Sequence, residues 1–264
     1  FNNSGFDVLG NGTSLIPYQK DMLLNLVTCA LVIAGGIGFP VIFELPLKHF
    51  SWKRLSMHTR VVLSTTFALL LFGTLLLKLT ENISWLGAFF YSVSARTAGF
   101  STYNLGDFST AGLLVVSGLM FIGASPASTG GGIKTTTFFV LLSGIYSAAT
   151  NHSERAFHSA IPKDAFRKAS VISMLAVFLV MTASYLMLIF DPQLSLRDVL
   201  FEMISAFSTS GLSTGITPQL SAQSRILSII MMYIGRLGPL TVASLWYFTI
   251  GERVRYPEGT IAIG

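Results

Sequence analysis

The sequence predicts an all-α polytopic membrane protein built from repeated units. Each unit has a spanning helix, a short half-helix, a glycine-centred loop and a second spanning helix. Three observations predict this class. Only 11% of the 264 residues are charged and 52% are hydrophobic, whereas soluble domains carry about 25% charged residues. Several apolar stretches are long enough to cross a bilayer. A phrase of small and polar residues around one glycine recurs along the chain.

The predicted spanning helices are separated by shorter apolar segments. The five predicted spans are 22–45, 60–79, 112–142, 168–190 and 225–250. The segments 85–95 and 198–208 have about 11 residues each, too few to cross a bilayer as a helix. Each leads directly into a glycine phrase, which favours a half-helix that enters the membrane and returns. The chain therefore divides into 1–47, the end of one unit, and two fuller units, 48–150 and 151–264.

The net charge of +5 follows this topology. Most Lys and Arg residues lie in the connections 48–60 and 151–168 and in the C-terminal tail, whereas the connections 78–84 and 191–198 hold few. The positive-inside rule puts the basic segments, and with them the C-terminus, in the cytoplasm. The basic charge therefore needs no nucleic acid as a partner. His49, His58, His152 and His158 also fall in these connections, and we predict that the chain is not an enzyme.

The glycine phrases are "NSGF", "TAGF" and "TSGL". A second glycine follows at the same interval in two units, since Gly123 comes 24 residues after Gly99 and Gly235 comes 24 after Gly211. Irregular backbone in a membrane is tolerated only where it is buried in protein or lines a watery path. Several such loops around one axis would turn carbonyl oxygens toward a dehydrated cation. The predicted ion-binding residues are Asn3, Ser4, Gly5, Thr97, Ala98, Gly99, Thr209, Ser210 and Gly211.

Alternatives stay open at this point. Small residues also allow close helix packing with no bound ion. Arg96 and Glu202 lie in the two half-helices, and we expect them to be mutual or neighbouring charge partners that fix the loops rather than ion ligands. An alternating-access carrier would need inverted repeats, whereas the copies here run in one orientation.

A second irregular stretch, "GASPASTGGGIKTTT" (123–137), interrupts a predicted span. Pro126 and three consecutive glycines should break the helix in mid-membrane. Lys134 at its end is costly in a membrane and is by default functional, although it could snorkel to the surface. Arg236 lies in the last predicted span, where a fixed cation would oppose cation passage or be held by loop carbonyls. The broken stretch is either a loop that moves or, as the alternative, a static kink in the helix.

The glycine phrases, together with "IGASPASTGGGIKTTT" and "IGRLGPLT", resemble the Trk/Ktr/HKT superfamily of potassium transporters, most closely the KtrB-type membrane subunit. The resemblance implies four units around a central pore, of which this sequence would hold about two and a half, as a fragment lacking the N-terminal part. It implies K+ uptake across the bacterial cytoplasmic membrane through a glycine-lined selectivity filter. A sodium-selective or Na+/K+-cotransporting relative is the alternative.

The resemblance also implies a gate and partners. The broken stretch would be the intramembrane loop that closes the pore below the filter. The implied partners are a second copy in a homodimer and a cytoplasmic KtrA-type ring that binds ATP and ADP, with Na+ modulating activity. The implied gating residues are Gly123, Ser125, Pro126, Thr129, Gly130, Gly131, Gly132, Lys134 and Arg236.

Overall fold

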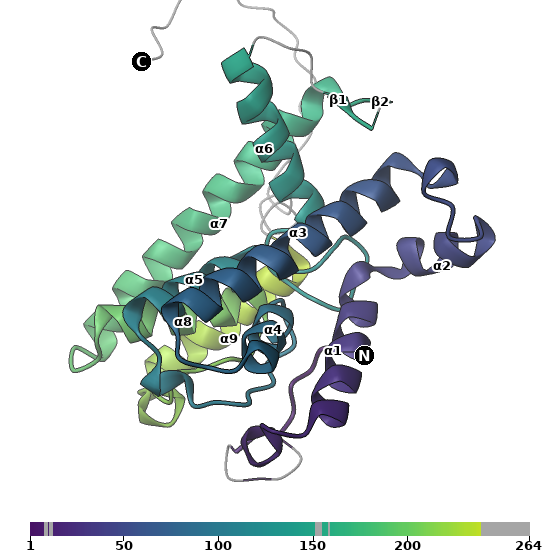
Figure 1. The fold of residues 1–264 in the computed structure, drawn as a ribbon. Coiled ribbons are helices and arrows are strands. Elements are labelled where there is room, and N and C mark those ends of the chain that lie inside the picture. Colours follow the sequence, from purple (N-terminus) through teal and green to yellow (C-terminus); the bar gives the residue numbers. More distant parts are fainter. Residues whose placement is uncertain (8–9, 11–12, 151–154, 158, 239–264) are drawn as a thin grey trace, which may run out of the picture.

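The computed structural model describes residues 1–7, 10, 13–150, 155–157 and 159–238, and these residues are mostly helical (Figure 1). The helices are α1 (Met22–Ile37), α2 (Phe39–Leu47), α3 (Met57–Thr80), α4 (Trp85–Ser94), α5 (Thr110–Phe121), α6 (Thr135–Thr150), α7 (Lys163–Phe190), α8 (Leu196–Ser208) and α9 (Ala222–Leu237). The predicted all-α class is confirmed. One small hairpin of β1 (Arg155–Ala156) and β2 (Ser159–Ala160) was not expected. The last part of the predicted span 225–250 and the C-terminal tail lie outside the described residues.

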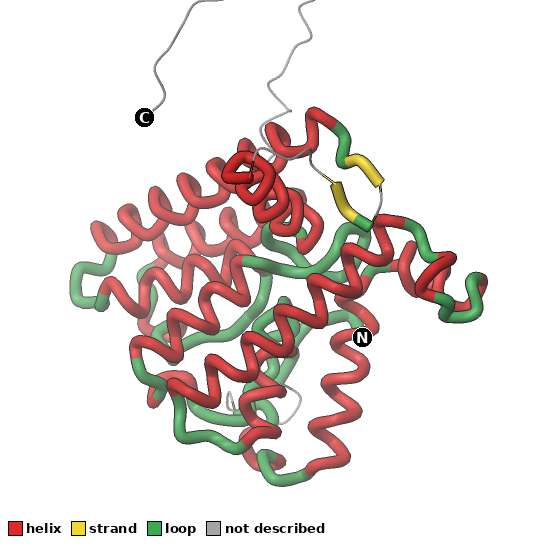
Figure 2. Tube along the Cα trace, turned by 45° about the horizontal axis from the view of Figure 1, so that its top comes forward, coloured by secondary structure: helices red, strands yellow, loops and turns green. Residues whose placement is uncertain are grey.

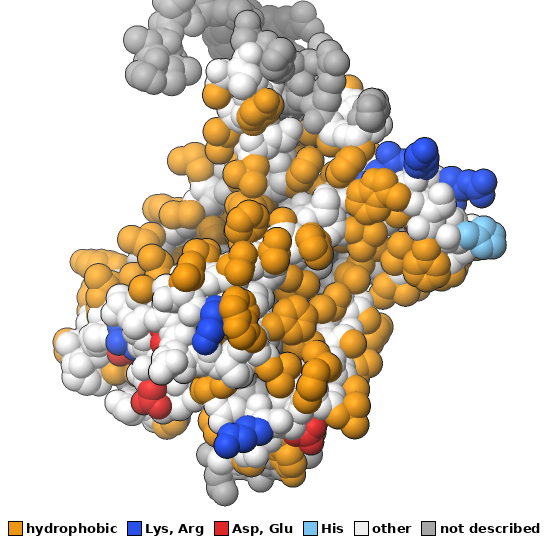
Figure 3. Space-filling model, in the orientation of Figure 1, with side chains coloured by type: hydrophobic (Ala, Val, Ile, Leu, Met, Phe, Trp, Pro, Cys, Tyr) orange, Lys and Arg blue, Asp and Glu red, His pale blue; other side chains and the backbone are white. Residues whose placement is uncertain are grey.

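Among the described residues, two helices, α3 and α7, are long and apolar enough by themselves to cross a membrane. Both carry large apolar side chains on their outer faces, among them Phe67 and Phe72 on α3 and Phe178 on α7. Hydrophobic side chains cover most of the face seen in Figure 3, and Lys and Arg gather at the α2–α3 end. Exposed apolar surface of this extent is expected for helices surrounded by lipid.

The predicted span 22–45 is not one straight helix. It bends by 98° between α1 and α2. Gly38 lies at the bend with φ +97°, a conformation that side-chain-bearing residues rarely adopt. Pro40, within the first turn of α2, has no N–H to continue the hydrogen-bond ladder of α1. The predicted span 112–142 is also interrupted, as expected, because α5 ends at Phe121 and α6 begins at Thr135.

The two short helices α4 and α8 lie inside the helix bundle of this chain. Helix α4 packs against α1, α3 and α5, and α8 packs against α5, α7 and α9. Figure 2 shows loops running through the middle of the molecule between the helices. The buried side chains of Phe90, Tyr91, Phe201 and Phe207 belong to these two helices. A half-helix surrounded by other helices does not need to span the bilayer, which explains how segments of this length are accommodated.

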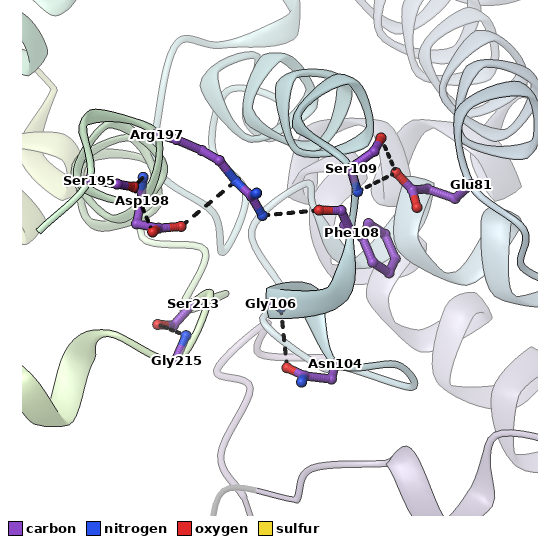
Figure 4. A network of polar contacts seen from close by, with 10 residues as sticks. All are labelled: Glu81, Asn104, Gly106, Phe108, Ser109, Ser195, Arg197, Asp198, Ser213 and Gly215. Carbon is purple, nitrogen blue, oxygen red and sulfur yellow. Dashed lines mark hydrogen bonds and ion pairs between the residues drawn. The ribbon is translucent and has the colours of Figure 1, made fainter.

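Carboxylates join the end of an outer helix to the start of the next inner helix. Glu81, directly after α3, accepts hydrogen bonds from the N–H (3.0 Å) and hydroxyl (2.6 Å) of Ser109, the residue that caps α5 (Figure 4). Asp191, directly after α7, accepts from the N–H of Ser221 (3.1 Å), which caps α9. The same arrangement, a carboxylate bonded to the serine that caps the next inner helix, thus occurs twice and fixes where α5 and α9 begin.

Candidate functional site

Three glycines from segments far apart in sequence lie next to one another. Gly5, Gly99 and Gly211 all have positive φ, at +59°, +81° and +83°. A Cβ added to Gly5 would collide with the carbonyl oxygen of Ala98 and lie 3.0 Å from the Cα of Gly99. A Cβ added to Gly99 would collide with the carbonyl oxygen of Ser210 and lie 3.5 Å from the Cα of Gly211. The main chains are therefore in direct contact: a side chain would collide at Gly5 and Gly99, whereas at Gly211 the positive φ is what favours glycine.

The backbone alternates in the same way in all three glycine phrases, 3–5, 97–99 and 209–211. The residue two positions before each glycine also has positive φ: 50° at Asn3, 76° at Thr97 and 54° at Thr209. The residue between them does not. The three phrases therefore share one local backbone pattern, although they lie far apart in the sequence.

Side chains connect neighbouring phrases. The Asn3 amide nitrogen donates to the hydroxyl of Thr97 (3.4 Å), and both side chains are buried. The hydroxyl of Ser210 donates to the carbonyl oxygen of Ala95 (3.3 Å), at the end of α4. These bonds tie the first phrase to the second and the third to the second.

A cavity of about 330 Å³ touches all three glycines. Residues that follow the glycines line it, including Ser101, Ser213 and Thr217. Asp7 is the one carboxylate among the lining residues. Hydroxyls, main-chain groups and a carboxylate line this cavity beside apolar side chains such as Leu105 and Leu212. We call it the polar mouth, at one end of the glycine phrases.

The 122–134 loop lies at the opposite end, against the residues that precede the glycines. A Cβ on Gly130 would collide with the hydroxyl of Thr97, and a Cβ on Gly131 would lie 2.6 Å from the hydroxyl of Thr209. Gly132 has φ +71°. Gly130 and Gly131 thus allow the loop to pack closely against two of the phrases, and Gly132 allows its close approach to Gly123 and the end of α5.

The same loop is bonded to the bend between α1 and α2. The N–H of Ser125 donates to the carbonyl oxygen of Gly36 (3.0 Å), and the hydroxyl of Thr129 donates to that of Gly35 (3.2 Å). In return, the N–H of Phe39 donates to the carbonyl oxygen of Ala127 (3.0 Å). A Cβ on Gly38 would lie 2.5 Å from the carbonyl oxygen of Pro126. The loop and the bend therefore hold each other in place.

Two cations bind adjacent carbonyl oxygens of the loop. The Lys134 ammonium donates to the carbonyl of Gly130 (2.7 Å), and the Arg236 guanidinium donates to that of Thr129. Lys134 therefore closes the loop on itself, whereas Arg236 connects it to α9. Gly123 also belongs to this arrangement, because a Cβ there would collide with the carbonyl of Gly131.

The expectation that Arg96 and Glu202 pair with each other or with a neighbouring charge is wrong. The one ion pair among the described residues joins Arg197 and Asp198 (3.8 Å). Arg96 and Glu202 are both buried, with 6% and 8% exposure. Glu202 instead accepts a hydrogen bond from the hydroxyl of Thr217 (2.6 Å). The two charges stand at non-equivalent positions, since Arg96 follows the end of α4 and Glu202 lies within α8.

The groups that hold the segments after the glycines were not predicted from the sequence. The Tyr91 hydroxyl, on α4, lies 2.7 Å from the Ser101 hydroxyl and accepts from the N–H of Tyr103 (3.0 Å). In the next unit, Thr217 contacts Glu202. The available signal was a polar side chain within each apolar half-helix and hydroxyls shortly after each glycine.

Comparisons with known proteins agree with this architecture. A profile of the TrkH family, described as a cation transport protein, matches residues 52–249. "Ktr system potassium uptake protein B" of Vibrio alginolyticus is 36% identical over 100% of this chain and 60% of its own length. "Ktr system potassium uptake protein D" of Bacillus subtilis is 36% identical over 99% of this chain and 61% of its own. "Potassium/sodium uptake protein NtpJ" of Enterococcus hirae is 33% identical over 100% of this chain and 62% of its own.

The chain thus spans less than two thirds of the length of these relatives. A solved structure, the potassium transporter TrkH from Vibrio parahaemolyticus, superposes with a TM-score of 0.75. It is 17% identical, and the match covers 93% of this chain and 56% of that one, so it shows the fold. The family profile covers most of the chain, and the chain therefore belongs to the TrkH family of cation transport proteins.

Proposed function

We propose that this chain carries K+ into the cell through a selectivity filter made by the glycine phrases. The observation that carries the proposal is the main-chain contact of Gly5, Gly99 and Gly211, with the same alternation of φ in each phrase. Rows of carbonyl oxygens can replace the hydration shell of an alkali cation. Two relatives are named potassium uptake proteins, which favours K+ as the ion. Among the described residues, no group of three His, Cys, Asp or Glu side chains offers a different metal site.

The pore is completed by a fourth phrase of the same kind. The inner helix α1 packs on the half-helix α4, and α5 packs on α8. Helix α9, the third inner helix, instead exposes Ile226, Ile229 and Tyr233. A further half-helix would cover this apolar face as α4 covers α1. In this proposal the chain divides into units at 1–47, 48–150 and 151–264.

The 122–134 loop is the gate in this proposal. It packs against Thr97 and Thr209, the residues that open two of the phrases. An ion leaving the phrases at that end has to pass the loop. Arg236 and Lys134 hold the loop by its carbonyl oxygens, so they stabilise the closed arrangement.

Further partners follow from the relatives' names. The two Ktr relatives are parts of a "Ktr system", which supports a second, regulatory component for this chain. We propose a homodimer with a cytoplasmic KtrA-type ring that binds ATP and ADP, docked on the basic connections. The name of NtpJ includes sodium, so Na+ as a coupled or transported ion is the second candidate.

Uptake of K+, Rb+ and Na+ by the full-length protein, in cells that lack other K+ systems, tests the proposal. Uptake is measured with and without the soluble partner. Gly99→Ala should abolish or strongly reduce K+ uptake, because its Cβ would collide with the Ser210 carbonyl at φ +81°. The matched control is Gly118→Ala in α5, whose Cβ meets nothing within 4 Å. Unchanged K+ uptake in correctly inserted Gly99→Ala would contradict the filter.

A further inference from the structure

The half-helix α8 carries a buried carboxylate directly behind the third glycine phrase. Glu202, in the middle of α8, is 8% exposed. Its Oε1 accepts from the hydroxyl of Thr217 (2.6 Å), and Thr217 lies 2.8 Å from the hydroxyl of Ser213. Ser213 in turn accepts from the N–H of Gly215 (3.0 Å; Figure 4). The carboxylate is thus connected to the 213–217 segment through the hydroxyls of Thr217 and Ser213. This segment follows Gly211 in the chain.

That segment forms part of the polar mouth. Ser213, Gly215 and Thr217 line the 330 Å³ cavity together with Gly211. Any shift of the segment therefore changes the wall of the mouth and the position of the chain that follows Gly211. Glu202 does not line this mouth; it lines a second cavity, of about 400 Å³, that shares Gly211, Ser213 and Thr217 with the mouth and is also lined by Arg225.

In the preceding unit, a neutral group holds the segment that follows the glycine. There the Tyr91 phenol, fully buried in α4, contacts Ser101 and Tyr103 in the segment after Gly99. The position in α4 that corresponds to Glu202 by distance from the glycine is Phe90. Only the later unit has an acidic residue at this position, so positioning the segment does not itself require one.

Glu202 forms no ion pair among the described residues: Arg225 lines the same 400 Å³ cavity, but its guanidinium donates to the carbonyl of Pro218. The single ion pair among the described residues lies elsewhere, and Oε2 of Glu202 receives no hydrogen bond. A buried carboxylate costs free energy unless it is paired. A cation that enters the adjacent mouth would supply the missing opposite charge, and water screens such an attraction less than one between exposed groups.

We propose that Glu202 has two separable roles: it positions the 213–217 segment through Thr217, and its negative charge raises the affinity of the mouth and of the adjoining glycine phrases for cations. The inference rests on the proposed function, because it assigns this residue to the same ion path. The charge role concerns all alkali cations alike. The positioning role concerns discrimination among them, which depends on the geometry of the oxygens.

Two substitutions separate the roles. Glu202→Gln keeps an oxygen that can accept from Thr217 and removes the charge. It should raise the half-saturation concentration for K+ and Rb+ uptake about fivefold, equivalent to about 1 kcal/mol, with little change in the K+ to Na+ uptake ratio. Thr217→Val keeps the charge and removes the hydrogen bond. It should lower the K+ to Na+ uptake ratio. Its half-saturation concentration for K+ should lie closer to that of the unsubstituted protein than the value for Glu202→Gln does.

The matched control is Asp107→Asn, which removes an exposed carboxylate of an outer connection. Ionic screening should leave its half-saturation concentration unchanged at physiological salt. A wild-type half-saturation in Glu202→Gln, or the same rise in Asp107→Asn, would overturn the charge role. An unchanged K+ to Na+ ratio in Thr217→Val would overturn the positioning role, and this holds even where Glu202→Gln fails to insert. Absence of K+ uptake by the unsubstituted protein would instead contradict the proposed function.

Discussion

Arg236 of α9 donates a hydrogen bond to the main-chain oxygen of Thr129 in the 122–134 loop. The two residues lie 107 positions apart in the sequence. The adjacent carbonyl, that of Gly130, is taken by Lys134. Arg236 therefore provides a direct bond from another helix to a loop that packs against Thr97 and Thr209, the first residues of two glycine phrases.

Arg236→Gln should weaken this bond and increase K+ flux. Hydrogen bonds to charged groups contribute about 1.5–3 kcal/mol, and a loss of about 1.4 kcal/mol shifts the population of a displaced loop about tenfold. Initial K+ uptake rates in cells measure the effect. Arg225→Gln is the control, because Arg225 binds the Pro218 carbonyl (3.0 Å) at the opposite end of α9. Equal rates in the two variants would show that the Arg236 bond does not restrain the loop.

Deletion of residues 126–132 should also raise flux and reduce control by the soluble partner. The deletion removes the glycines that pack against Thr97 and Thr209 and the bonds of Thr129 to Gly35. The glycine phrases remain, so the K+ to Na+ uptake ratio should stay near that of the intact chain. A fall in flux would identify the loop as a structural support rather than a gate.

The irregular backbone was predictable from the sequence. Gly99, Gly211 and Pro126 restrict local conformation wherever they occur, and their repetition marked both the glycine phrases and the broken span. The bend at Gly38 had a comparable local signal in "GIGFP", but an uninterrupted apolar run suggested one straight span. Glycine and proline residues thus predicted where helices end, but they did not predict the direction in which the chain continues.

Contacts between distant side chains were less predictable. Charge alone suggested that Arg96 pairs with Glu202, but the pairing depends on how α4 and α8 are rotated about their axes. Thr217, only 15 residues after Glu202, supplies a partner without bringing two units together. The contact of Arg236 with Thr129 likewise follows from packing that the sequence pattern does not encode.

Ser109→Ala should destabilise the protein modestly. Ser109 caps α5 through its hydroxyl, which accepts from the N–H of Gly112 (3.0 Å) and donates to Glu81 (2.6 Å). Loss of such a cap costs about 1 kcal/mol, which lowers Tm by about 2–4 °C in a domain of this size. Thermal unfolding in detergent measures it. Thr110→Ala at the neighbouring exposed position is the control, and an equal loss there would contradict the capping role.

The Asp191 carboxylate gives a pH-dependent contribution to stability. The Ser224 hydroxyl and the Ser221 N–H face this carboxylate and hold the pKa of Asp191 below its ordinary value, against the opposite effect of burial. The ordinary pKa of Asp is about 3.9. A carboxyl with a lowered folded-state pKa stabilises the fold above that ordinary value, and the stabilisation disappears as the pH falls through the folded-state pKa.

Asp191→Asn should therefore lower Tm most above about pH 5, and the difference from the unsubstituted protein should shrink as the pH falls below about 4. Tm measured in detergent across this range tests the expectation. Asp107→Asn removes an exposed carboxylate of the same charge and should leave Tm close to that of the unsubstituted protein throughout. A Tm difference between Asp191→Asn and the unsubstituted protein that stays constant down to acidic pH would contradict this expectation. It would show that the Ser221 and Ser224 contacts stabilise the protein equally whether or not Asp191 is charged.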